Sequence, residues 1–335
     1  MPGTIYDVAQ QAGVSTATVS RVVAGGARVS PATRQRVADA IRELGYRPNA
    51  LARSLAVGHT RTVALLLPDI TNPFFPELVK GVQLVADEDG YTLILCETAG
   101  DPDKEARYLT MLRGQQVDGL LAIGLTLPRA RTEQVLGPDL PVVCLDRSMD
   151  LRRASQVHVN HRQGARLATQ HLLALGHRHI AHIAGPPALR VGAARREGYQ
   201  LALREAGLRP DRAAVIAGDL TEDGGYAAAL RLLEHPGPAP TAIFVANDLM
   251  AIGAMAALRA RGIGVPGDLS VVGFDDIHLA AYTSPPLTTV HQPAREMARR
   301  ATEILLAAIA APGDRRPRRA VFDATLVVRG SSAPP

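Results

Sequence analysis

One stretch decides the fold of the amino-terminal segment: Val8-Ala9-Gln10-Gln11-Ala12-Gly13-Val14-Ser15, followed at once by Thr16-Ala17-Thr18-Val19-Ser20-Arg21. Just before it, Thr4 and Asp7 have the spacing of a capping box, which predicts a helix from about Ile5 to Ala12. Gly13 ends that helix, because a tight turn needs left-handed backbone angles that are costly for residues with a Cβ atom. Ser15 caps a second helix, and two helices crossing at such a turn form a helix-turn-helix.

The second helix, from Thr16 to about Val23, has one open face. Its buried side holds Val19 together with Val22 or Val23, and a third helix beginning at Ser30 and Pro31 closes the small core with Val37, Ile41 and Leu44. The open face carries Thr16, Ala17, Ser20 and Arg21. On a DNA-reading helix we expect base edges to be contacted by Thr16, Ala17 and Arg21, and phosphates by Ser15, Thr18 and Tyr6.

The distribution of charge favours this prediction over an ordinary helical hairpin. Residues 1–61 hold eight arginines against three acidic residues, a net charge of +5, and the whole chain also carries +5. The remaining residues therefore balance to zero. Positive charge confined to one small segment is typical of a module that binds a polyanion.

Length and composition set the broad class. A chain of 335 residues with 47% hydrophobic residues predicts two or three folded units with buried cores. Cys96 and Cys144 both lie in apolar runs, which indicates buried thiols in a reducing compartment. The chain has no signal-peptide pattern and no run long enough to cross a bilayer, so we expect a cytoplasmic protein without a membrane contact.

Beyond residue 62, short apolar runs alternate with longer stretches of helical period. Strands are predicted at 63–67, 91–95, 119–123, 142–145, 180–183, 215–217, 242–245 and 271–273. Strand and helix in steady alternation predict an α/β core with parallel sheets covered on both faces. One wide sheet and two smaller ones are both compatible with this series. We favour two lobes, because the series restarts after the polar stretch 150–156, and a crevice between lobes suits a small polar ligand.

Motifs for catalysis, metals and cofactors are missing from the sequence. There is no Gly-Lys-Ser/Thr phosphate loop, no Gly-x-Ser-x-Gly elbow and no Gly-x-Gly-x-x-Gly after a strand, which argues against a dehydrogenase or another nucleotide-dependent enzyme. His177, His179 and His182 have no acidic or cysteine partner nearby, so we expect structural roles rather than a metal site. The arginine cluster at 315–319 is flanked by Pro and Gly and is predicted to be a solvated loop.

Taken in order, these parts resemble the lactose-repressor/galactose-repressor family of bacterial transcription regulators over essentially the whole chain. The matching segments lie at 4–9, 17–21, 44–49, 52–55, 69–75, 175–177, 195–199, 247–248, 273–276 and 285–290. The resemblance implies a helix-turn-helix head, a hinge helix and a two-lobed core like that of periplasmic binding proteins.

The resemblance also places a hinge helix at residues 49–57, which orders on operator DNA and inserts Leu55 into the minor groove. Asn49 can cap this segment, which favours helix but is too short to be stable alone, and an apolar wedge is a known way to bend DNA. Leu51 and Leu55 packing on the core is the alternative. The full set of expected DNA contacts is Thr4, Tyr6, Ser15, Thr16, Ala17, Thr18, Ser20, Arg21, Arg28, Asn49, Ala52, Arg53 and Leu55.

For the ligand, the core is similar to ribose-type sugar-binding proteins. Carried onto this chain, the resemblance implies a site formed by Asn72, Phe74, Phe75, Asp146, Arg147, Arg195, Asn247, Asp275 and Gln292. Carboxylates, guanidinium groups and amides make paired hydrogen bonds to neighbouring hydroxyls, and aromatic rings cover the apolar face of a sugar. Asn72 could instead be a helix cap with Phe74 and Phe75 in the core. Leu220 stands where ribose-type proteins commonly have a third aromatic residue.

The predicted organisation is a head at 1–47, a hinge and linker at 48–61, a first lobe at 62–158 with 292–320, and a second lobe at 159–291 with 321–335. The predicted function is a ligand-responsive regulator, acting as a repressor, that binds a near-palindromic operator as a homodimer and senses ribose or another pentose. The alternatives are a purine- or nucleoside-responsive regulator of the same family and a solute-binding transport protein. The basic head and the missing signal sequence argue against the latter.

Overall fold

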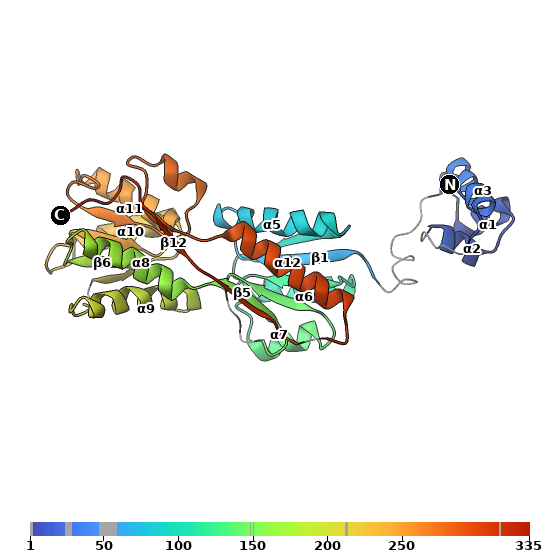
Figure 1. Ribbon diagram of the computed structural model, residues 1–335, viewed down its shortest axis with the longest axis horizontal. Coiled ribbons are helices and arrows are strands. Elements are labelled where there is room, and N and C mark those ends of the chain that lie inside the picture. Colours follow the sequence, from blue (N-terminus) through green and yellow to red (C-terminus); the bar gives the residue numbers. More distant parts are fainter. Residues whose placement is uncertain are drawn as a thin grey trace. The chain divides into compact units, whose positions relative to one another are not determined.

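The computed structural model describes residues 3–23, 29–46, 59–147, 149, 151–211, 214–314 and 316–335. Contacts divide the chain into two compact units, one of residues 1–62 with 115–118 and one of the remaining residues. We call the first unit the head and the second the core (Figure 1). Within the described residues, no helix is both long enough and apolar enough to span a membrane.

The described part of the head contains three short helices, α1 (Ile5–Ala12), α2 (Thr16–Val23) and α3 (Pro31–Glu43). The predicted capping box at α1 is present, because the Thr4 side chain accepts from the backbone of Asp7 and the Asp7 carboxylate accepts from Thr4 N at 2.7 Å. Gly13 adopts the left-handed conformation at φ 63°. The amide of Thr18 donates to Ser15 Oγ at 3.2 Å, which caps α2. The helix-turn-helix predicted from the sequence is confirmed.

The three helices of the head enclose a small hydrophobic cluster. Val8, Val19 and Val37 are fully buried at the centre of a cluster that joins all three helices. Ala40 also lies in this cluster, whereas the predicted Ile41 and Leu44 pack at its edge. The expected DNA contacts Arg28, Asn49, Ala52, Arg53 and Leu55, together with the hinge segment 49–57, lie outside the described residues.

The first lobe of the core is built on a six-stranded sheet in the order β11-β5-β4-β3-β1-β2. Its strands are β1 (Thr62–Leu67), β2 (Thr92–Glu97), β3 (Gly119–Ala122), β4 (Val142–Leu145), β5 (Ser155–Val159) and β11 (Arg319–Phe322). Its helices are α5 (Phe74–Glu88), α6 (Pro102–Gly114), α7 (Arg129–Leu136) and α12 (Ala294–Ala310). Helix α12 packs on α5 and on β3, β4 and β5, while α6 packs on α7.

The second lobe has a four-stranded sheet in the order β7-β6-β8-β9. Its strands are β6 (Ile180–Ala184), β7 (Val215–Ala217), β8 (Ala242–Val245) and β9 (Ser270–Val272), and its helices are α8 (His161–Ala174), α9 (Arg190–Glu205), α10 (Glu222–Leu233) and α11 (Asp248–Ala260). In the two larger sheets, β1 and β3, β3 and β4, β4 and β5, β5 and β11, β6 and β7, β6 and β8, and β8 and β9 pair in parallel. The predicted α/β core with two parallel sheets is confirmed.

Four of the described strands were not predicted, namely β5 in the sheet of the first lobe and three shorter ones. The strands β10 (Thr289–His291) and β12 (Thr325–Val327) form a separate antiparallel pair, preceded by the 3₁₀-helix η1 (His278–Tyr282). The strand β11 pairs with β5 in the first lobe, so the predicted lobe boundary between residues 320 and 321 falls inside a strand. The arginine cluster is therefore not wholly a solvated loop, because Arg319 begins that strand and pairs with Gln156.

Candidate functional site

Helix α2 presents the predicted reading face to solvent. Ala17 and Arg21 are exposed, while Thr16 and Ser20 are half-buried and Val19 faces the core. No acidic side chain in the described part of the head forms an ion pair with Arg21. An exposed, unpaired guanidinium on a helix-turn-helix can bind guanine edges or phosphates without first breaking an internal bond.

The residues expected to contact phosphates flank this face. Tyr6 is 74% exposed on α1, and Thr4 and Ser15 are also exposed. The hydroxyls of Ser15 and Thr18 lie 3.0 Å apart, so both also take part in capping α2. A hydroxyl at a helix start can keep its cap and still meet a phosphate oxygen, because it has both a donor and acceptor capacity.

In the core, polar residues from both lobes meet beyond the carboxyl ends of the strands. Asp146 follows β4, His161 begins α8 after β5, and Asp275 follows β9. His161 Nε2 lies 3.4 Å from the carbonyl oxygen of Asp146 and 3.7 Å from its carboxylate. Residues distant in sequence are thus brought together at the edge of the sheets where α/β proteins bind ligands.

Arg195 is the centre of this cluster. Its guanidinium donates to Asp275 Oδ1 at 3.1 Å and to the carbonyl oxygen of Ala246, and it lies 3.3 Å from His161 Nδ1. The Phe274 ring lies beneath it, with the guanidinium carbon 3.8 Å from the ring centroid. Stacking on Phe274 and three polar contacts fix the orientation of the Arg195 guanidinium.

Asp275 and Arg147 complete the cluster on its two sides. Gln292 Nε2 donates to Asp275 Oδ1 at 2.7 Å. In the first lobe, the Arg147 guanidinium carbon lies 5.6 Å from the centre of the Phe75 ring, and Arg147 Nε is 3.9 Å from the Asp146 carboxylate. The structure therefore brings together Phe75, Asp146, Arg147, Arg195, Asp275 and Gln292 from the predicted ligand set.

Several polar atoms of this cluster are buried without a hydrogen-bond partner. They are Asp146 Oδ1, Arg147 Nε, Arg195 Nε and Gln292 Oε1, and the two others found among the described residues are His158 Nδ1 and His182 Nε2. Buried polar groups in folded proteins are nearly always hydrogen-bonded. Two unpaired donors and two unpaired acceptors in one place indicate a site built for a polar ligand.

The backbone is strained at the same place. Asp146, Asp275 and Asp276 have φ values of 62°, 118° and 56°, and Leu220 has 75°. Left-handed angles cost free energy in residues other than glycine, and they concentrate at binding sites.

Burial controls the protonation of the cluster. It raises the pKa of Asp275 to about 6, although the charge of Arg195 opposes the rise. Burial also raises the pKa of Asp146 against the opposing charges of Arg147 and Arg195. The pKa of His161 is well below its usual value, first through burial and then through Arg195, so the imidazole is neutral at neutral pH.

Three other predicted ligand residues mainly support the fold. Asn72 Oδ1 accepts from the amide of Phe74 at 3.0 Å, which holds the start of α5. Phe74 is buried and packs edge-to-face on Phe75. Asn247 accepts from Met250 N at 3.1 Å and donates to Leu220 O at 3.0 Å. One hydrogen of each Asn amide group is still available to a ligand.

His161, Phe274 and Asp248 were missed from the sequence. Asp248 is fully buried beside the cluster, where it accepts hydrogen bonds from the Thr289 hydroxyl and from Ile277 N. His161 follows β5 as Asp146 follows β4, and this strand-end position was the available signal. It was overlooked because β5 is partly polar. Phe274 gave no signal, since a buried ring next to a strand is usually core.

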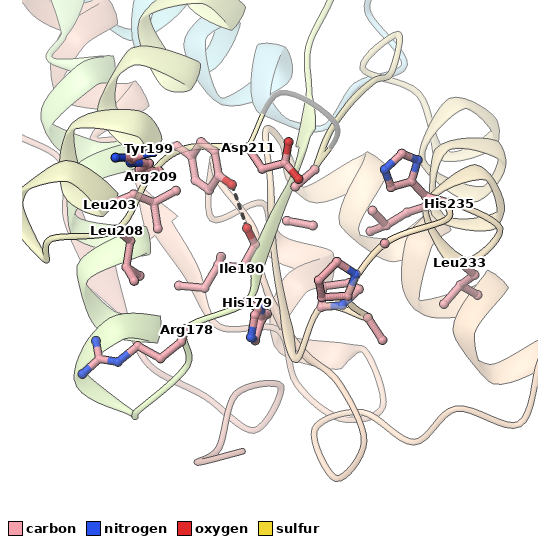
Figure 2. Close-up of a pocket in the computed structure, with 17 residues that line it drawn as sticks. Arg178, His179, Ile180, Tyr199, Leu203, Leu208, Arg209, Asp211, Leu233 and His235 are labelled. Carbon is pink, nitrogen blue, oxygen red and sulfur yellow. Dashed lines mark hydrogen bonds between the residues drawn. The ribbon is translucent and has the colours of Figure 1, made fainter.

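A separate cavity of about 220 Å³ lies at the opposite, amino-terminal ends of the strands of the second lobe. Figure 2 shows Ile180, Tyr199 and Leu203 among its lining residues, with the Tyr199 hydroxyl donating to Ile180 O at 2.7 Å. None of the predicted ligand residues lines it. The cavity and the polar cluster are therefore different places on the second lobe.

Comparisons with known proteins agree with this architecture. A profile described as "Bacterial regulatory proteins, lacI family" matches residues 4–49, and a "Periplasmic binding protein-like domain" matches residues 169–332. The ribose operon repressor of Escherichia coli K12 is 40% identical over 331 residues, covering 98% of this chain and 99% of the relative. The HTH-type transcriptional repressor PurR of Vibrio atlanticus is 42% identical over 304 residues, covering 90% and 91%.

Solved structures show the same likeness. A lac repressor dimer bound to operator and the anti-inducer ONPF has a TM-score of 0.87 at 31% identity, covering 99% of this chain and all of that one. A LacI-family regulator of Enterococcus faecium with bound ribose has a TM-score of 0.75 at 29% identity, covering 82% and 99%. A helix-turn-helix head joined to a two-lobed core of the periplasmic-binding-protein type defines a class of transcription regulator. The chain belongs to the LacI family of bacterial regulatory proteins.

Proposed function

We propose that the protein is a repressor that binds operator DNA through the head and responds to a small polar effector bound between the lobes of the core. The observation that carries this proposal is the buried cluster of Asp146, Arg147, Arg195, Asp275 and Gln292, in which four polar atoms have no partner among the described residues. The exposed, unpaired Arg21 on α2 supports the DNA-binding half. The repressors among the relatives support both.

The effector that we propose first is ribose or another pentose. Adjacent sugar hydroxyls both donate and accept, which matches two carboxylates and two guanidinium groups in one site, and the Phe75 ring offers an apolar surface. Support comes from the ribose operon repressor of E. coli and the ribose-bound regulator of E. faecium. Because the PurR of V. atlanticus is equally similar to this chain, a purine is the second candidate.

The proposed mode of action links the two sites. Two copies of the chain read two half-sites, as in the dimeric lac repressor structure, and effector binding changes the relation of the lobes and thereby the hinge at 48–61. The proposed DNA contacts are those predicted from the sequence. The proposed domain boundaries are also the predicted ones, except that strand β11 extends the second segment of the first lobe to Phe322. Closure of this kind needs an effector that binds one lobe arrangement more tightly than the other.

Calorimetric titration of the full-length protein with pentoses, hexoses, nucleosides and purines tests the proposal. We expect one class of compound to bind the wild type, and binding to be lost in Asp275→Ala while operator affinity without effector is kept. Asp87→Ala, which removes an exposed carboxylate near the end of α5, at the opposite end of the helix from Phe75, is the matched control. Binding retained in Asp275→Ala would place the effector elsewhere.

A further inference from the structure

Glu105 is a buried carboxylate without a cationic partner in the described structure. It lies in the first turn of α6, is 0% exposed and forms no ion pair with any described basic side chain. A buried charge of this kind is costly unless hydrogen-bond donors surround it. The hydrogen-bond donors that offset the cost of burying the Glu105 carboxylate must therefore stay close to it in the folded protein.

Those groups all belong to one loop, residues 124–127, which follows β3. Thr126 N lies 2.9 Å from both carboxylate oxygens, the Thr126 hydroxyl lies 3.0 Å from Oε1, and Leu127 N donates to Oε2 at 2.8 Å. Hydrogen bonds to an ionised group are roughly twice as strong as neutral ones. Moving this loop would leave the carboxylate buried and unpaired, so Glu105 anchors it.

The other end of the loop supports Arg147. Gly124 has φ 60°, and a Cβ atom there would lie 2.4 Å from Arg147 Cδ, so the arginine stem lies directly against the glycine. Leu125 N lies 3.2 Å from Met149 Sδ, two residues beyond Arg147. The loop thus touches the chain at Arg147 and just after it.

Among the described residues, Arg147 has few other contacts that hold it. No described residue bonds its buried Nε, its carboxylate neighbour Asp146 is 3.9 Å away, and its guanidinium lies over Phe75 at 5.6 Å. A long, flexible side chain with loose contacts samples several rotamers unless packing fixes it. The packing that fixes the stem is the loop that Glu105 anchors.

We propose that Glu105 is a positioning residue of the effector site, which fixes loop 124–127 and thereby holds the Arg147 guanidinium ready for a ligand. The inference rests on the proposed function, in that Arg147 is taken to contact the effector. Glu105 does not contact the ligand. By keeping Arg147 ordered before the ligand binds, it lowers the conformational entropy that Arg147 loses on binding.

The test compares three variants of the full-length protein with ¹⁵N-labelled arginine, in which the Nε–Hε signal of Arg147 is assigned from Arg147→Lys. In Glu105→Gln, the side-chain NH₂ group faces the N–H groups of the loop, which are also donors, so the loop is held less tightly. We therefore expect the Arg147 signal to show faster motion of larger amplitude than in the wild type. Thr126→Val, which removes only the hydroxyl contact, should show a smaller change. Thr132→Val is the control, because its hydroxyl bonds the far end of the loop at Leu127 O and Pro128 O.

Titration with D-ribose gives the second measurement. If ribose binds the wild type, we expect Glu105→Gln to weaken ribose affinity about tenfold, because the hydrogen bond from the charged Arg147 guanidinium to the sugar is then misplaced. We expect Thr132→Val to change ribose affinity little. If ribose does not bind, the proposed effector fails, and the NMR comparison still decides the role of Glu105. Unchanged Arg147 motion in Glu105→Gln and Thr126→Val, with faster amide exchange at residue 126, would overturn the proposal.

Discussion

Asp275 is a buried carboxyl group whose pKa is shifted toward neutral pH. Burial raises its pKa to about 6 from an ordinary value of 3.8. The folded state therefore keeps this proton at pH values where the unfolded chain has lost it, and the free energy of unfolding falls as pH rises from about 4 to about 6. A carboxylate accepts stronger hydrogen bonds from sugar hydroxyls than a carboxylic acid does.

Affinity for a neutral sugar should accordingly rise with pH up to a plateau above about 6, by at most about tenfold per pH unit below it, because one proton is released. Calorimetry between pH 5 and 7.5 measures this. Asp275→Asn should bind more weakly and without the pH dependence. A wild-type affinity that does not change over this range would exclude ionised Asp275 as the acceptor.

Arg21 is the corresponding residue of the head. Because it is exposed and forms no internal ion pair, its loss should leave the folded head intact. Arg21→Ala should cost about 1–3 kcal/mol of binding at its own base pair and relax the preference there. Competition binding to operators varied one base pair at a time measures the effect. An unchanged preference at every position would show that Arg21 does not contact a base.

At the scale of single residues, the predicted ligand set came from the resemblance to ribose-type proteins, and the position in the chain supports it at two members. Asp146 comes directly after the apolar strand β4, and Asp275 comes three residues after β9. His161 follows a strand whose pattern is partly polar, so the same rule was not applied to it. The burial that shifts the pKa of each group depends on neighbours from other elements, and no local pattern contains that information.

Among the elements, α10 and α11 pack closest through glycines. A Cβ atom on Gly225 would lie 2.2 Å from Met250 O, and one on Gly253 would lie 1.9 Å from Glu222 O. Both neighbours are backbone atoms, so the helices themselves would have to separate. Gly225→Ala should therefore lower the free energy of unfolding of the core by about 1–3 kcal/mol, the usual cost of overpacking.

Thermal or urea unfolding measures this change, and Gly114→Ala is the control. Gly114 ends α6 with nothing within 4 Å of a built Cβ, so alanine there should be neutral or stabilising by about 0.5–1 kcal/mol. If the two variants were equally stable, the close approach of α10 and α11 would not limit the packing.

Apolar strands were predictable and partly polar ones were not. Most strands of the two parallel sheets are apolar runs, because both faces are buried, and their helices repeat with a period near 3.6. The strand β5 belongs to the first of these sheets, but its sequence Ser-Gln-Val-His-Val is partly polar, and it was missed. The strands β10, β11 and β12 have three or four residues each and mixed polarity. Their pairing is decided by the partner strand, so the sequence of each by itself gives no comparable signal.

For the whole molecule, we expect a homodimer of the 35.5 kDa chain in solution. The dimeric lac repressor structure supports this. Light scattering at micromolar concentration measures the mass. A mass of four chains would contradict the prediction, and a monomer on operator DNA would contradict the reading of two half-sites by two heads.

The sequence by itself determined the helix-turn-helix, the α/β class of the core and the concentration of positive charge in the head. Caps, turns and periodicities are local, because each is a contact between residues a few positions apart. Only the tertiary structure decided that Asp146, His161, Arg195 and Asp275 meet, and that Glu105 anchors the loop beneath Arg147. Those contacts join positions far apart in the chain, and they form when two sheets of fixed strand order place their carboxyl ends together.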